Sequence, residues 1–341
     1  MKTIQQTILA TSLLAASSLC GQMLIDTVFV GNPGNAAQSS ANRNHNVPWG
    51  DGFGAVSYGY HIGTYAVTNA QYTVFLNAVA SSDPHGLWNA NMGSSVHGGI
   101  SRSGSDGSYT YSVRTATEGF NSGKSMGNMP VNFVSFWDAA RFTNWLTTGN
   151  TETGVYNLGG VTAPDNSTIL RDNVAWLAGG VAIASEDEWY KAAYYDPTLN
   201  SGSGGYWLFP TRSDELPTAE TPPGGANSAN YNNSVGTGTV TEVGAYTGSA
   251  SYYGTFDQGG NVWELNETIV GTADRVLRGG AFGGNFTGLW SSGRSTNSPT
   301  NEGVAIGFRV SSLAPIPEPT TYATILGCLG LALALIRRRR K

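Results

Sequence analysis

Residues 259–264 read Gly-Gly-Asn-Val-Trp-Glu, a tight glycine turn that leads directly into an aromatic residue. Two related stretches follow, Arg-Val-Leu-Arg-Gly-Gly at 275–280 and Gly-Phe-Arg-Val at 307–310. Short apolar runs bounded by glycine are typical of strands that end in turns. The C-terminal third is therefore predicted to consist of short strands joined by glycine turns.

Upstream of this region, three segments carry the same helix-start signature. In each, a Ser or Thr is followed three residues later by Gln, Asp or Glu: Thr68 with Gln71, Ser135 with Asp138, and Ser185 with Glu188. The hydroxyl can accept from a first-turn amide while the longer side chain reaches back, which is a capping box. The pattern predicts helices from these caps to Ala80, Leu146 and Tyr195. Each follows a short strand-like run, at 61–67, 129–134 and 181–184.

Composition indicates a loop-rich globular body. The chain has 46 glycines among 341 residues, and only 12% of its residues are charged. It also carries 9 Trp, 16 Tyr and 12 Phe, far more aromatic residues than a disordered chain contains. The two cysteines, Cys20 and Cys328, lie near the ends, so the body has none. An aromatic core or a bound metal, not disulfides, must stabilise it.

Taken in order, these motifs resemble those of the sulfatase-modifying factor family, whose best-known member is the formylglycine-generating enzyme. The matching stretches lie at 67–72, 130–139, 182–190, 260–264, 278–282 and 307–309. The resemblance runs from Phe29 to Val310. It implies an α+β fold, the formylglycine-generating-enzyme fold, a relative of the C-type lectin fold with little regular secondary structure.

The resemblance does not extend to the family's redox chemistry. Oxidase members bind copper(I) through two cysteines soon after Arg-Gly-Gly, but residues 281–293 contain none, so copper is not expected. Other members use an iron bound by histidines on a helical domain. The four histidines here, His45, His61, His85 and His97, lack that spacing.

A structural calcium ion is what the resemblance implies instead. The matching positions for one site are Gly259, Gly260, Val262 and Glu264, and those for a second site are Asn230 and Tyr231. Oxygen ligands of this kind suit Ca²⁺. The alternative for Glu264 is a local cap or ion pair. Arg278, Arg294 and Arg309 are expected near the family's groove, where internal hydrogen bonding is the favoured role.

A non-catalytic module that binds a ligand, protein or glycan is the favoured function. Loops rich in Asn, Ser, Gly, Tyr and Trp suit adaptable recognition on a rigid frame. The predicted groove residues are Asn285, Phe286, Trp290, Arg294 and Asn297. Two alternatives remain: an oxidase of the formylglycine-generating type, or another enzyme that reuses the same groove.

Both ends of the chain read as targeting segments around a domain at 23–313. Residues 1–22 have the pattern of a signal peptide. At 314–341, a Pro-Glu-Pro break precedes an apolar run at 320–336 and five basic residues, the arrangement of a membrane anchor with its positive end in the cytoplasm.

This C-terminal pattern resembles the PEP-CTERM sorting signal of Gram-negative bacteria that make exopolysaccharide. The resemblance implies transient membrane anchoring through a C-terminal helix, cutting by an exosortase-type protease, and delivery to the cell surface or extracellular matrix. The partners to expect there are exopolysaccharide or a surface protein. The alternative is an ordinary single-span anchor.

Charge argues against nucleic acid as a partner. Without residues 1–22 and 314–341, the body keeps 12 basic and 22 acidic residues. Binding to phosphates needs clustered Lys and Arg, which an acidic body does not supply.

Overall fold

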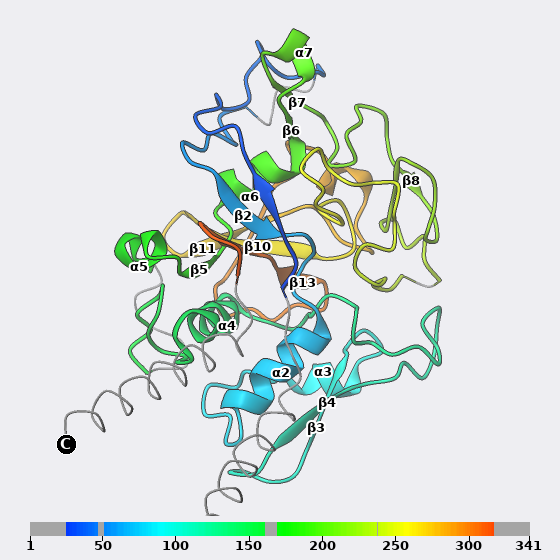
Figure 1. Ribbon diagram of the computed structural model, residues 1–341. Coiled ribbons are helices and arrows are strands. Elements are labelled where there is room, and N and C mark those ends of the chain that lie inside the picture. The colour runs from blue at the N-terminus through cyan, green and yellow to red at the C-terminus, as the bar shows by residue number, and fades with distance from the viewer. Residues whose placement is uncertain (1–24, 47–50, 161–168, 237, 317–341) are drawn as a thin grey trace, which may run out of the picture. The chain divides into compact units, whose positions relative to one another are not determined.

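Two four-stranded sheets form the centre of the described chain (Figure 1). The computed structural model describes residues 25–46, 51–160, 169–236 and 238–316. The predicted signal peptide, and the predicted sorting signal beyond residue 316, lie outside these ranges. Among the described residues, no helix is long and apolar enough to cross a membrane.

The first sheet joins the two ends of the described chain. Its strands are β1 (Thr27–Val30), β2 (Tyr60–Gly63), β14 (Val310–Ser312) and β5 (Val181–Ile183), in that order and all antiparallel. One row of paired residues crosses the whole sheet: Phe29 opposite His61, His61 opposite Ser312, and Ser312 opposite Val181.

The second sheet contains the glycine-bounded motifs. Its order is β12 (Ser295–Asn297), β11 (Asp274–Arg278), β10 (Trp263–Val270) and β13 (Ile306–Phe308). β10 runs parallel to β13, and its pairing with β11 shifts register between Leu265 and Ile269. The predicted short strands of the C-terminal third are therefore confirmed.

All three capping boxes are present. They open α2 (Asn69–Val79), α4 (Phe136–Thr148) and α6 (Glu186–Tyr194), with Thr68, Ser135 and Ser185 accepting from the third amide of each helix. α4 runs two residues past its predicted end and stops at Gly149, which has a φ of 76°. A left-handed residue at that position is readily supplied by glycine.

Two of the strand-like runs behave differently from prediction. Residues 129–134 form no strand; Pro130 makes one isolated bridge to Thr68, and Phe133 has a φ of 57°. Proline cannot donate to a ladder, and a left-handed residue interrupts the pleat. In the run at 61–67, β2 ends at Gly63 and the chain turns.

The remaining elements are short and connect these parts. The helices are α3 (Ala90–Ser94), α5 (Asn173–Leu177) and α7 (Leu199–Gly202), and the 3₁₀ turn η2 spans Phe286–Gly288. The strand pairs are β3 (Ile100–Ser103) with β4 (Thr110–Val113), β6 (Tyr195–Asp196) with β7 (Gly205–Tyr206), and β8 (Thr218–Ala219) with β9 (Ser228–Ala229).

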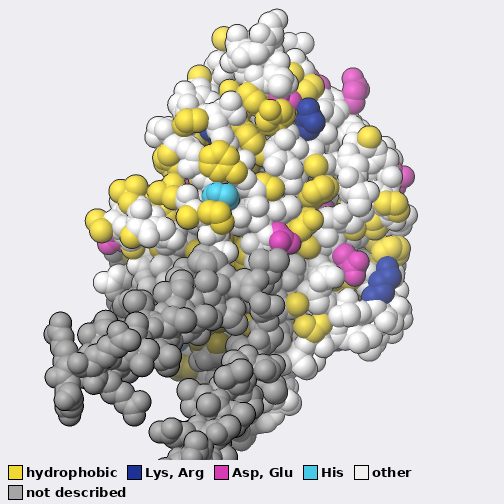
Figure 2. Space-filling view, viewed as in Figure 1, with side chains coloured by type: hydrophobic (Ala, Val, Ile, Leu, Met, Phe, Trp, Pro, Cys, Tyr) yellow, Lys and Arg dark blue, Asp and Glu magenta, His cyan; other side chains and the backbone are white. Residues whose placement is uncertain are grey.

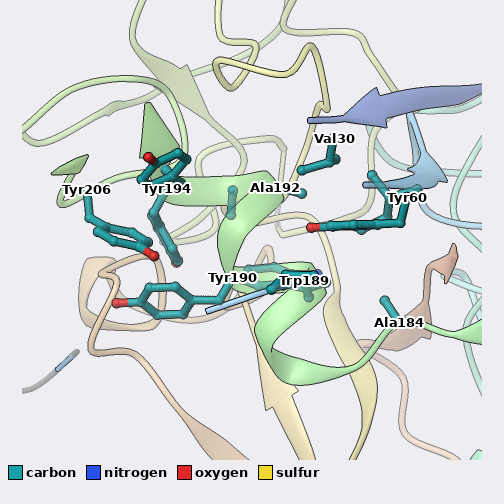
Figure 3. Close-up of a cluster of buried hydrophobic side chains, with 12 residues drawn as sticks. Val30, Tyr60, Ala184, Trp189, Tyr190, Ala192, Tyr194 and Tyr206 are labelled. Carbon is teal, nitrogen blue, oxygen red and sulfur yellow. The ribbon is translucent and has the colours of Figure 1, made fainter. Parts of the chain in front are cut away.

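Helix α6 lies in a core cluster rich in aromatic residues (Figure 3). Trp189 and Tyr190 project from it, with Val30 and Tyr60 of the first sheet on one side and Tyr194 and Tyr206 on the other. Tyr190 and Tyr194 meet edge to face, with ring centroids 4.8 Å apart. Aromatic packing thus replaces disulfides in the described body, as the composition predicts.

Candidate ligand-binding groove

A turn of two glycines begins the groove loop, which we define as residues 279–294. Gly279 and Gly280, directly after β11, have φ values of 95° and 76°. A Cβ on Gly279 would lie 2.7 Å from the Gln258 carbonyl oxygen, and one on Gly280 would lie 3.0 Å from a Leu289 methyl. Only glycine combines this backbone with so close an approach. The loop therefore folds back tightly onto the sheet.

Two arginines and one glutamate fix the far end of the loop. Glu186, the first residue of α6, accepts from Arg278 Nε at 2.8 Å and from Arg294 Nε and Nη2 at 2.8 and 2.9 Å. Arg278 is fully buried and also donates to the carbonyls of Ser291 and Gly293, each at 2.9 Å. The pKa of Arg294 is raised, chiefly by its hydrogen bond to Glu186. The internal role predicted for Arg278 is confirmed.

An open groove of about 540 Å³ lies along this loop. Its sides carry two indole rings and several polar groups. The lining residues are Trp263, Gly284, Asn285, Thr287, Gly288, Trp290, Ser292, Gly293 and Arg294. The groove combines flat apolar surfaces with amide, hydroxyl and guanidinium groups.

The structure brings four of the five predicted groove residues together. Asn285, Trp290 and Arg294 line the groove, and Arg294 keeps 30% of its side chain exposed. Phe286 packs edge to face on Trp290, with centroids 5.4 Å apart. Asn297 is not among the lining residues: it lies in β12, where its Oδ1 accepts from Asn301.

Sequence reasoning missed Trp263 as a groove residue. In the sequence, Trp263 stands out only as part of the Gly-Asn-Val-Trp-Glu motif. Along β10, Glu264 is buried, whereas Trp263 is only half-buried and lines the groove. The alternation of side chains along a strand would have placed these two neighbours on opposite faces. A Cβ on Gly288 would lie 3.3 Å from the Trp263 ring, so the glycine leaves room for the indole.

The carboxylate of Glu264 already accepts three hydrogen bonds. Its Oε1 accepts from Arg309 Nη2 at 2.8 Å, and its Oε2 accepts from Arg309 Nε at 2.9 Å and from Trp189 Nε1 at 2.7 Å. A Ca²⁺ on these oxygens would face the guanidinium charge directly. Glu264 in this arrangement does not fit a calcium site, and its geometry matches the alternative of a local ion pair.

Asn230 offers a better oxygen. The side chain is buried, and its Oδ1 has no hydrogen-bond partner among the described residues. Its Nδ2 donates to Thr239 O and to Asn261 Oδ1. The nearby Thr241 Oγ1, linked through the same Asn261, is also unpartnered. Two buried oxygens without hydrogen-bond donors fit a bound cation or water. The described residues contain no cluster of three or more His, Cys, Asp or Glu that could hold a metal ion.

One serine–histidine pair borders the groove. Ser291 Oγ lies 3.4 Å from His45 Nε2. Burial and the neighbouring Arg43 lower the pKa of His45 to about 4, so its imidazole is neutral. Ser291, however, is completely buried and cannot reach a substrate. This arrangement is structural, not that of an accessible nucleophile.

Comparison with known proteins identifies the family. The family described as "Sulfatase-modifying factor enzyme 1-like domain" matches residues 23–313. Treponema denticola variable protein 1 is similar in structure, with 18% identity, a TM-score of 0.51, and coverage of 86% of this chain and 98% of that one. CarF is comparable, with 18% identity, a TM-score of 0.50, and coverage of 86% and 99%. No curated protein sequence matches. At this identity the structures establish the fold alone, and the family match, which spans most of the chain, shows that the protein belongs to the sulfatase-modifying factor enzyme 1-like family.

Proposed function

We propose that the protein is a non-catalytic binding module whose groove takes a glycan. The observation that carries the proposal is the pairing of Trp263 and Trp290 with Asn285, Thr287 and Arg294 along one open groove. An indole face packs on the apolar face of a sugar ring, and amide and hydroxyl groups bind sugar hydroxyls. An open groove also admits a chain that is longer than the groove itself.

Ligand chemistry disfavours the oxidase alternative. Copper(I) oxidation in relatives of this kind needs two thiolates after Arg-Gly-Gly, and residues 281–293 supply only alcohols, amides and aromatic rings. These are poor ligands for a soft metal. An enzyme of another type lacks a specific observation in its favour, since the Ser291 hydroxyl is buried.

Export and surface delivery remain part of the proposal. They rest on the sequence patterns at 1–22 and 314–341, which imply a signal peptide, a membrane-anchored stage and processing by an exosortase-type protease. Exopolysaccharide or a surface protein as the partner rests on the sorting-signal pattern. The relation to C-type lectins rests on the family resemblance, and the absence of nucleic acid binding rests on the acidic charge of the body.

A structural calcium ion is also proposed, at Asn230 in preference to Glu264. Its support is the unpartnered Asn230 Oδ1 beside Thr241 Oγ1. The backbone oxygen of Tyr231 is the further ligand that the family resemblance implies. The ion would hold the 230–241 segment against the Gly259–Gly260 turn, where Asn261 N already bonds to Asn230 O.

A binding assay on immobilised polysaccharides tests the function. Alginate and dextran serve as acidic and neutral probes alongside exopolysaccharide fractions. We expect saturable binding by the wild type and at least a tenfold loss in Trp290→Ala. Phe29→Ala is the control, because Phe29 is an exposed aromatic residue outside the groove. Equal binding by the two variants would place the site elsewhere, and no binding to any probe would overturn the glycan proposal.

A further inference from the structure

Four large apolar side chains stand exposed near one end of the strands of the first sheet. We call them the apolar rim: Phe29, Leu170, Val174 and Leu177, with exposures of 58, 55, 79 and 72%. Figure 2 shows hydrophobic side chains gathered over α5, which contributes two of the four. Single exposed aliphatics are common, but a group of this size on a secreted domain marks a contact surface.

Helix α5 presents this surface rigidly. Its five residues are capped by Asp172, whose carboxylate accepts from the Val174 and Ala175 amides. Trp176 points inward, 4% exposed, and stacks on the Arg171 guanidinium at 4.3 Å. Val174 and Leu177 are left facing solvent because Trp176 occupies the inner side.

Topology places the chain's exit beside the rim. β5 begins at Val181, four residues after Leu177, and Val181 pairs with Ser312 at the end of β14. In an antiparallel pair, the end of one strand lies beside the start of the other. The chain therefore enters from α5 and leaves toward Ile316 at the same end of this sheet. Phe29, on β1 three strands away from β5, lies in the same cross-strand row through His61.

The sequence beyond the exit supplies the occupant. The apolar run at 320–336 begins four residues after Ile316, a reach of about 14 Å at most. A bilayer that holds this run must therefore lie within that reach of Ile316, the last residue that the structure describes. We propose that, while the protein is anchored, the apolar rim rests on the lipid bilayer. This inference depends on the proposed membrane-anchored stage.

Charge specifies the kind of lipid contact. In the segments 25–30 and 169–180, which carry the rim, the sole basic residue is Arg171. It is 8% exposed and ion-paired to Glu188 and Glu267. Asp26 and Asp172 are exposed in the same segments. The rim therefore enters zwitterionic lipid by hydrophobic contact, without the polybasic attraction that anionic lipid requires.

Site-directed labelling of the full chain in phosphatidylcholine vesicles tests the docking. Cys20 and Cys328 are first replaced by alanine, and single cysteines are introduced as Val174→Cys and Leu177→Cys. Val96→Cys and Leu216→Cys are matched controls, because these side chains are 48 and 50% exposed outside the rim. An environment-sensitive fluorophore on each cysteine is then exposed to nitroxide-labelled lipid.

We expect quenching at 174 and 177 to exceed quenching at 96 and 216 by about twofold or more, and to persist in 0.5 M salt. Adding Val174→Glu to the Leu177→Cys protein should lower quenching at 177. Co-flotation with vesicles separates the two ways to fail. If the chain floats but quenching is equally low at all four sites, the anchor is present and the proposal that the apolar rim rests on the bilayer is wrong. A chain that does not float overturns the anchored stage and the docking with it.

Discussion

Arg309, the residue between β13 and β14, and Glu264, the second residue of β10, form a buried bidentate ion pair. Nε and Nη2 of the arginine reach the two carboxylate oxygens at 2.9 and 2.8 Å, and the side chains are 0 and 1% exposed. Arg309 also donates to the carbonyls of Gly63, Thr64 and Phe256. One guanidinium therefore ties together segments separated by more than two hundred residues.

Glu264→Gln should destabilise the fold strongly. The change removes the carboxylate that is hydrogen-bonded to the buried Arg309 charge, and breaking a buried pair in this way typically costs about 3–5 kcal/mol. Urea unfolding at pH 7 measures the loss in unfolding free energy. Glu242→Gln is the control, because Glu242 is exposed. A loss below about 1 kcal/mol would show that the pair contributes little.

Chelation should separate the two proposed calcium positions. If Asn230 Oδ1 binds the ion, EDTA lowers the melting temperature of the wild type, and Asn230→Ala removes that response. Glu264→Gln should melt earlier but respond to EDTA as the wild type does, because its carboxylate is held by Arg309. An unchanged wild-type melting temperature in EDTA would contradict structural calcium altogether.

Trp263→Ala should weaken ligand binding although sequence reasoning did not select it. Its ring lines the groove beside Trp290 and has no other described role in the core. Loss of one stacking surface predicts roughly a tenfold rise in the dissociation constant, equivalent to about 1.4 kcal/mol. The assay is the same polysaccharide titration, with circular dichroism to confirm folding. Binding at wild-type strength would confine the ligand to the Trp290 side.

The sequence predicted the helices well because their signals are local. Thr68, Ser135 and Ser185 each mark a helix start with a partner only three residues away, and the structure contains all three boxes. Sheet order was not predictable in the same way. β14 inserts between β2 and β5, and strand neighbours so distant in sequence leave no local pattern.

The groove was predicted in part for a similar reason. Asn285, Trp290 and Arg294 lie close together in one loop, so a single motif located them. Trp263 reaches the same groove from another strand, and Asn297 leaves it because β12 pairs it with Arg275. Contacts between segments distant in sequence place Trp263 in the groove and Asn297 outside it. A motif that is local in the sequence carries no information about such contacts.

Asp138→Asn should gain stability relative to the wild type as pH rises. Burial raises the pKa of Asp138 from 3.8 to about 7, despite its hydrogen bonds with Ser135. Between these pH values the folded state holds a proton that the unfolded state has lost, so wild-type stability falls as pH rises from about 4 to 7. An amide keeps the cap and does not titrate.

Urea unfolding of both proteins at pH 5 and pH 8 measures this effect. The unfolding free energy of the variant minus that of the wild type should be larger at pH 8 than at pH 5 by at least about 1 kcal/mol. Asp106→Asn, in an exposed loop, should show no such change. A difference independent of pH would mean that Asp138 is ionised throughout this range.

Lys191→Met should stabilise the protein most at low pH. The side chain is completely buried, and burial lowers its pKa from 10.5 to about 8. Between pH 8 and 10.5 the unfolded state binds the extra proton, so wild-type stability rises with pH and the cost of the buried charge is fully present below pH 8. The single described hydrogen bond runs from Lys191 Nζ to the carbonyl oxygen of Asn32, at 2.9 Å. Asn32 is exposed, so water can replace the lysine as the donor to that oxygen.

The variant's advantage in unfolding free energy should therefore shrink between pH 7 and pH 10, while the exposed Lys124→Met shows no trend. An advantage that grows with pH would refute the buried-charge account, because tyrosine ionisation affects both proteins equally.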